Sequence, residues 1–201
     1  MVIELETART RLRGWRPEDL DAFAAMNADP QVMEHFPAPL SREESDALAV
    51  RSQQSLERDG LGFFALEIKA SPPESEPRFA GFVGLWQVPF EAPFTPAVEV
   101  GWRLAVWAWG KGYAGEAASA CLAYGFEQLG LPRIVSFTAT TNQRSTAVMR
   151  RLGMTHDPAL DFDHPWLPLG HPLRRHLLYR ITREEFAQGK PTREAPAKPS
   201  Q

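Results

Sequence analysis

The order of apolar and polar residues predicts that the chain begins with a strand and two helices. Residues 10–15 alternate polar and apolar side chains, which is typical of a strand, and Pro17 favours the first turn of a helix that continues over residues 20–27. Residues 41–44, Ser-Arg-Glu-Glu, have the form of a capping box, so a second helix is expected from there, ending at Gly60.

The rest of the chain predicts a sheet with helices between its strands. Two β-rich runs, 63–68 and 79–88, are separated by a proline-rich loop at 71–77 and are expected to pair as antiparallel neighbours. The elements expected after them are a strand at 97–106, a helix at 113–129, a strand at 133–140, a helix from Asn142 or Ser145 to Arg151, a long ordered loop at 154–172 and a closing strand at 175–181.

Composition narrows the class of protein. With 201 residues, 43% of them hydrophobic, the chain suits one domain, expected over residues 1–186, and residues 187–201 are too polar to fold and are expected to form a disordered tail. A net charge of -3 argues against nucleic-acid or membrane partners. Cys121 is the only cysteine, and no export signal is evident, so a cytoplasmic protein is expected.

A glycine-rich turn is the first candidate binding site. Gly110, Gly112 and Gly115 lie between the strand at 97–106 and the following helix, where backbone N–H groups at a helix N-terminus are free to bind an anion. Lys111 either adds positive charge there or points into solvent. The spacing matches neither the dinucleotide signature nor the nucleotide-triphosphate loop.

This turn resembles the acetyl-CoA signature of the GNAT acetyltransferases, Q/R-x-x-G-x-G/A. Trp109 stands at its first position, with Gly112 and Ala114 at the later ones, a form familiar in the branch that resembles the ribosomal-protein N-terminal acetyltransferases. A second block, residues 142–154, is similar to that branch's N-x-x-S-x-x-V-x-x-x-x-G-F/M segment. The likeness covers roughly residues 5–182.

The resemblance implies the fold and the cofactor site. The fold is a mixed α/β GNAT fold, with a twisted sheet of six to seven strands, about four helices, and a splay between the fourth and fifth strands where the pantetheine arm of acetyl-CoA lies. The pyrophosphate would rest on the glycine turn at a helix N-terminus. The implied cofactor-binding residues are Leu104, Val106, Gly110, Lys111, Gly112, Tyr113, Ala114, Gly115, Asn142 and Ser145.

The implied function is transfer of acetyl from acetyl-CoA to a primary amine, by direct attack in a ternary complex. The amine belongs to a protein N-terminus or a small molecule, and no metal is needed. The alternative is a non-catalytic acyl-CoA sensor or assembly module on the same fold. Dimers are common in the family, which leaves a homodimer open.

Glu99 is the first candidate for a catalytic base, because an ammonium group near pKa 10.4 for lysine, or 7.7–8 for an α-amino group, must lose a proton before it attacks. The resemblance places a glutamate of this strand at the acceptor cleft. The alternative is a structural ion pair, although Arg103, about 13 Å along the same strand face, is too far to be the direct partner.

The remaining chemical roles are assigned to a backbone N–H group and to three side chains. A backbone N–H near Leu104 would stabilise the oxyanion, and Ser145 is either the acid that protonates the leaving thiolate or a helix-capping hydroxyl. His164 and His171, in the loop expected to shape the acceptor pocket, are alternative bases with a weaker claim than Glu99. Their spacing with Asp161 and Asp163 matches no standard metal site, so a hydrogen-bonded loop is expected there.

Overall fold

The computed structural model describes residues 2–70 and 76–189, so residues 71–75 of the expected loop and residues 190–201 of the expected tail lie outside it. The strands are β1 (Leu5–Glu6), β2 (Thr10–Arg13), β3 (Gly62–Ile68), β4 (Arg78–Gln87), β5 (Val98–Leu104), β6 (Arg133–Ala139), β7 (Thr155–His156), β8 (Phe162–Asp163) and β9 (Arg175–Thr182). The helices are α1 (Asp19–Ala28), α2 (Arg42–Asp59), α3 (Tyr113–Glu127), α4 (Gln143–Arg151) and α5 (Arg183–Gly189), with one-turn 3-10 helices η1 (Val106–Ala108) and η2 (Pro158–Leu160).

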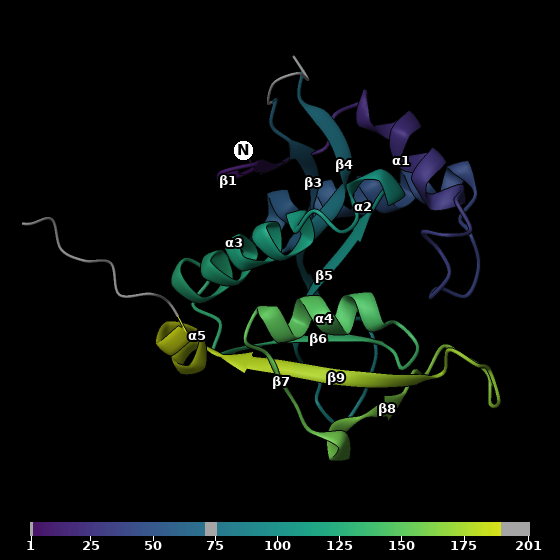
Figure 1. Cartoon of the computed structure of the whole chain (residues 1–201), viewed down its shortest axis with the longest axis vertical. Coiled ribbons are helices and arrows are strands. Elements are labelled where there is room, and N and C mark those ends of the chain that lie inside the picture. Colours follow the sequence, from purple (N-terminus) through teal and green to yellow (C-terminus); the bar gives the residue numbers. More distant parts are fainter. Residues whose placement is uncertain (1, 71–75, 190–201) are drawn as a thin grey trace, which may run out of the picture.

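One mixed sheet joins the strands in the order β1-β2-β3-β4-β5-β6-β9-β7, with β8 added beside β9. All neighbours are antiparallel except β5 and β6, which pair in parallel only at Glu99 and Val135. Figure 1 shows β1–β4 in one half of the molecule and β6–β9 in the other, with β5 running between them. The strands therefore part beyond Glu99, toward their carboxyl ends.

The two faces of the sheet pack against different hydrophobic clusters. Val98, Val100 and Leu104 of β5 belong to the cluster that α3 covers with its small residues, together with Met149 of α4. The opposite face of β5 carries Glu99, Gly101 and Arg103, and Phe82, the β4 partner of Arg103, packs there against Phe23 of α1. Glu99 thus lies on the face of β5 opposite to the one that α3 covers.

Several expected boundaries agree with the structure, although the strand expected to reach residue 106 ends at Leu104 and the helix expected to reach residue 129 ends at Glu127. Ser41 and Glu44 form a complete capping box on α2, and Gly60 ends that helix in the left-handed conformation with φ 74. The antiparallel pairing of β3 with β4 is confirmed. Of the two expected starts of α4, Asn142 is the cap.

The counts of strands and helices differ from the expectation. Within residues 2–70 and 76–189 there are nine strands and five helices instead of six to seven and about four. The extra strands β1, β7 and β8 have two residues each and lie at sheet margins or beside β9. If they are set aside, β5 and β6 are the fourth and fifth strands, so the splay lies where the family likeness put it.

The fifth helix, α5, occupies residues that were expected to be loop and tail, including 187–189. Thr182 and Glu185 form a reciprocal cap, in which each backbone N–H donates to the other's side chain at 2.8 and 3.2 Å. Phe186 then packs against Phe126 of α3, with ring centroids 5.2 Å apart. These contacts hold one more helical turn on the sheet.

Candidate active site

The glycine turn leads from η1 into α3 and leaves a helix N-terminus open. Gly110 and Gly112 have φ 73 and 84, which only glycine adopts without strain, and Gly112 is an N-cap with no side-chain hydrogen bond. A Cβ built on Gly110 or Gly115 would meet nothing within 4 Å. Uncapped N–H groups beside open space suit a pyrophosphate, so the turn fits acetyl-CoA.

Arg9 and Glu116 brace this turn from outside, a role that the sequence patterns did not reveal. Glu116 accepts hydrogen bonds from the Arg9 backbone N–H at 2.8 Å, from Arg9 Nε at 2.7 Å and from Thr7 Oγ1 at 2.5 Å. Arg9 Nη1 donates to the carbonyl of Lys111 at 2.9 Å. Burial opposes ionisation, but the bonds from Thr7 and Arg9 lower the pKa of Glu116. The lysine side chain itself is exposed, 5.7 Å over the Trp107 ring.

The edge of β5 that faces β6 offers backbone groups to the splay. Ala105 N–H donates to Ala80 of β4, so the backbone of alternate residues, including Trp102 and Leu104, points the other way, toward β6. The Leu104 carbonyl accepts from Trp109 Nε1 at 2.8 Å, which leaves its N–H as the free group. Val106 lies past the strand, and its carbonyl accepts from the Trp109 backbone N–H at 3.0 Å.

Trp109 accordingly fills the end of the splay at the position where the family signature has Gln or Arg. Its indole bonds Leu104, and the Arg144 guanidinium of α4 lies 4.4 Å over its ring. The two halves of the sheet are therefore joined by side chains at this end. The Arg144 contact holds α4 against the glycine turn.

Glu99 has no hydrogen bond or ion pair to any other residue in the described part of the chain. It lies where β5 meets β6, opposite Val135 and beside Trp86 of β4, and is partly buried. Desolvation raises its pKa from 4.5 to about 8. The alternative of a structural ion pair is not found among these residues. Within residues 2–70 and 76–189, the carboxyl group is therefore a weakly acidic group without a partner, on the face of β5 opposite α3.

Asn142 and Ser145 begin α4, and their roles differ from the expectation. Asn142 Oδ1 accepts from the Ser145 backbone N–H at 3.1 Å, and its Nδ2 donates to Thr138 at 3.0 Å. The capping side chain is therefore Asn142, and the capping alternative for the Ser145 hydroxyl is wrong. That hydroxyl has no protein partner among the described residues and is partly buried.

The side chains of the two candidate histidines are fixed by contacts with neighbouring residues. His164 packs against Phe90 and His176, and burial, with His176 beside it, lowers its pKa to about 4. His171 Nδ1 accepts from the Leu173 N–H at 3.1 Å. Because His164 binds a proton so weakly near pH 7, it is a poorer base than Glu99.

The long loop is hydrogen-bonded, as expected, by its acidic residues. Asp161 pairs with His156 at 2.8 Å, and Asp163 pairs with Arg174 at 3.3 Å and Arg175 at 3.4 Å. Across residues 2–70 and 76–189, no group of three or more His, Cys, Asp or Glu side chains could hold a metal ion. In the same part of the chain, no helix has the length and apolar character of a membrane span.

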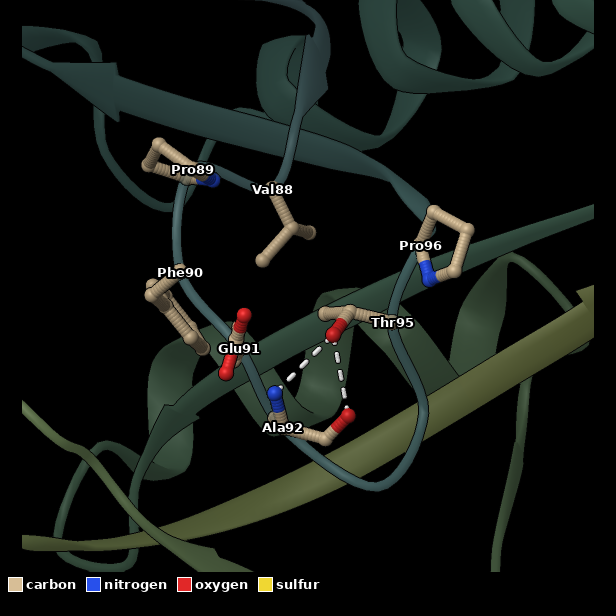
Figure 2. Close-up of a pocket in the computed structure, with 7 residues that line it drawn as sticks. All are labelled: Val88, Pro89, Phe90, Glu91, Ala92, Thr95 and Pro96. Atoms are coloured by element: carbon tan, nitrogen blue, oxygen red, sulfur yellow. Dashed lines mark hydrogen bonds between the residues drawn. The ribbon is translucent and has the colours of Figure 1, made fainter.

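A separate hollow lies in the β4–β5 connection. Figure 2 shows it within residues 88–92, Thr95 and Pro96, with the Thr95 hydroxyl bonded to both backbone groups of Ala92 at 2.9 Å. None of the candidate site residues lines it. Its walls come from one loop, so it belongs to that loop and not to the splay.

The fold and this site define an acyltransferase of the GNAT class, and comparison with known proteins agrees. The acetyltransferase (GNAT) domain family matches residues 9–155, and the chain belongs to that family. It is similar to an FsC-acetyl coenzyme A-N(2)-transacetylase of Aspergillus fumigatus, with 31% identity over 186 residues that cover 90% of this chain and 77% of the relative.

Solved structures extend the likeness. An acetyltransferase from Agrobacterium tumefaciens is 27% identical, with a TM-score of 0.69 over 90% of this chain and 95% of that one. RimL, a ribosomal L7/L12 alpha-N-protein acetyltransferase in complex with coenzyme A, is 16% identical with a TM-score of 0.70 over 90% and 98%, a likeness of fold alone. The predicted family and fold are confirmed. The protein is an acetyl-CoA-dependent acetyltransferase of the GNAT family.

Proposed function

We propose that the protein transfers the acetyl group to a primary amine by direct attack in a ternary complex, with Glu99 as the base. The observation that carries this proposal is the unpaired Glu99 carboxyl group at the point where β5 and β6 part. The name of the Aspergillus relative, an N(2)-transacetylase, supports nitrogen as the accepting atom.

The raised pKa of Glu99 suits this role. A base is most effective when its pKa lies near the working pH, and about 8 is close to that of an α-amino group. The amine nitrogen forms a bond to the thioester carbonyl carbon, Glu99 takes the amine proton, and the carbon–sulfur bond breaks. Burial thus converts an ordinary glutamate into a base that matches its substrate.

Acetyl-CoA would be held by groups that the structure leaves free. The N–H groups of Gly112, Tyr113, Ala114 and Gly115 would bind the pyrophosphate, and those of Trp102 and Leu104 face the splay, where negative charge develops on the carbonyl oxygen. Ser145 is the proposed donor to the leaving thiolate, since its hydroxyl has no other partner in the described residues.

Replacing Ser145 with alanine is expected to lower kcat about tenfold or more, because the thiolate loses its proton donor. The melting temperature should not change, since Asn142 caps α4. Steady-state kinetics with acetyl donors of decreasing thiol pKa provide the measurement, and the loss should shrink as the thiol becomes more acidic. An unchanged kcat with a raised KM for acetyl-CoA would assign Ser145 to cofactor contact only.

The proposed cofactor site is tested by thermal or urea unfolding with acetyl-CoA and with CoA. At about one hundred times its dissociation constant, either ligand should stabilise the wild type by about 2.7 kcal/mol. Gly115→Val should fold like the wild type, because space is open around its Cβ, yet lose most of that stabilisation because the added side chain enters the pyrophosphate space.

Two outcomes would count against this site. Equal stabilisation of wild type and Gly115→Val would mean that the pyrophosphate does not lie on the glycine turn. No stabilisation of the wild type at millimolar cofactor would overturn the proposed function itself.

A further inference from the structure

Arg103 is a partly buried cation without an acidic partner among the described residues. Its side chain leaves β5 on the face that carries Glu99, and its Nη1 donates to Asn27 Oδ1 at 2.8 Å. Nε is fully buried and has no hydrogen-bond partner, and among the described residues no carboxylate forms an ion pair with the guanidinium. Burial lowers the pKa of Arg103 to about 10, so it remains charged at neutral pH.

Arg13, which is buried, shows a different arrangement. Arg13 is bonded to the carboxylates of Asp19 and Glu67 through three nitrogens at 2.7, 2.8 and 3.0 Å. Buried charges in folded proteins are normally paired in this way, because an uncompensated charge loses its hydration. Asn27 is a neutral acceptor and supplies no charge to Arg103.

Two aromatic rings and Asn27 surround the guanidinium of Arg103. The guanidinium lies 4.0 Å over the Phe36 ring, in the connection between α1 and α2, and 5.3 Å from the Phe82 ring. With Nη1 used by Asn27 and Nε fully buried, Nη2 is the nitrogen left to donate to a carboxylate from outside the protein. The same strand face carries Glu99, about 13 Å away between Cα atoms.

We propose that Arg103 recognises a carboxylate on the acceptor, so that the substrate is an amine that also carries an acid group. This inference rests on the proposed function, because Glu99 defines where the amine lies. Arg103 is then a specificity-determining residue, and Asn27, which is itself fixed by a bond from its Nδ2 to Ser45 Oγ at 2.8 Å, positions it. The carboxylate of the acceptor supplies the negative charge that no described residue provides to the Arg103 guanidinium.

The test compares matched acceptors, each offered as carboxylate and as the corresponding carboxamide, with wild type, Arg103→Gln and Arg103→Lys. Wild type should prefer the carboxylate by at least about tenfold in kcat/KM, and Arg103→Gln should lose that preference while its KM for acetyl-CoA stays the same. Arg103→Lys should recover part of it, since charge returns without the planar fork. Arg51→Gln, an exposed arginine of α2, is the control.

Calorimetric binding of the same pairs to the CoA-saturated protein separates this inference from the proposed function. Carboxylate binding that disappears in Arg103→Gln, without any turnover in the wild type, would support Arg103 and overturn amine acetylation. Turnover of acid and amide at equal rates would support acetylation and overturn the role of Arg103. A higher KM for acetyl-CoA in Arg103→Gln, with the carboxylate preference retained, would also overturn it. Retained CoA binding shows that the variant is folded.

Discussion

Glu99→Gln is expected to lower kcat about 10²- to 10⁴-fold, because the amine then has no group to accept its proton. Glutamine has the same shape and removes no ion pair, since Glu99 forms none within the described residues. Binding of acetyl-CoA should be unaffected, as Glu99 lies at the start of β5 and the glycine turn follows its other end. The variant therefore separates chemistry from cofactor binding.

The pH profile sharpens this prediction. A base acts only when deprotonated, so kcat of the wild type should rise about tenfold per pH unit below the Glu99 pKa of about 8 and level off above it. An acceptor that is already neutral over this range keeps its own titration out of the profile. In Glu99→Gln this rise of kcat with pH should disappear. A wild-type kcat that is flat from pH 6 to 9 would contradict the assignment.

Stability gives an independent check on the same group. The pKa of Glu99 is about 8 in the folded state and 4.5 in the unfolded state. Between these two pH values, the folded state therefore keeps a proton that the unfolded state has lost. The contribution of Glu99 to stability should therefore fall as pH rises from 4.5 toward 8, so the stability of Glu99→Gln relative to the wild type should increase over this range. Near pH 9 the variant should be the more stable of the two, measured by urea unfolding.

The sequence predicted features that depend on residues close together in the chain. The period of two placed Glu99, Gly101 and Arg103 on one face of β5, and the capping box placed the start of α2, because both patterns are local. The glycine turn was recognised for the same reason. Its left-handed residues, Gly110 and Gly112, have a chemical signature that needs no knowledge of the fold.

Features that depend on distant partners were not predictable in this way. The bond between Arg9 and Glu116 joins residues 107 positions apart, and that between Asn27 and Arg103 spans 76. The distance along β5 showed only that Arg103 does not pair directly with Glu99. That no carboxylate reaches Arg103 from another element became visible in the packed structure, since any acidic residue of the chain was a possible partner.

Arg13→Met is expected to be the most destabilising of these substitutions, by about 3–5 kcal/mol, because it leaves the buried Asp19 carboxylate without its cation and removes from Glu67 the nearest of its cations. Arg13, Asp19 and Glu67 are 4, 3 and 6% exposed, so water cannot replace the lost bonds. Burial alone would lower the pKa of Arg13, but Asp19 and Glu67 raise it, which shows how strongly they hold the charge. Urea unfolding at neutral pH measures the loss.

The control for Arg13→Met is Arg42→Met, which removes exposed ion pairs to Asp21 and Asp46 and should cost less than about 1 kcal/mol. Equal effects of the two variants would show that the buried network adds no more than a surface pair. The network also ties the start of α1 to β2 and β3, and the same helix carries Asn27. Loosening Arg13 should therefore weaken carboxylate selection at Arg103 even at temperatures where the variant remains folded, because Asn27 no longer holds the guanidinium in place.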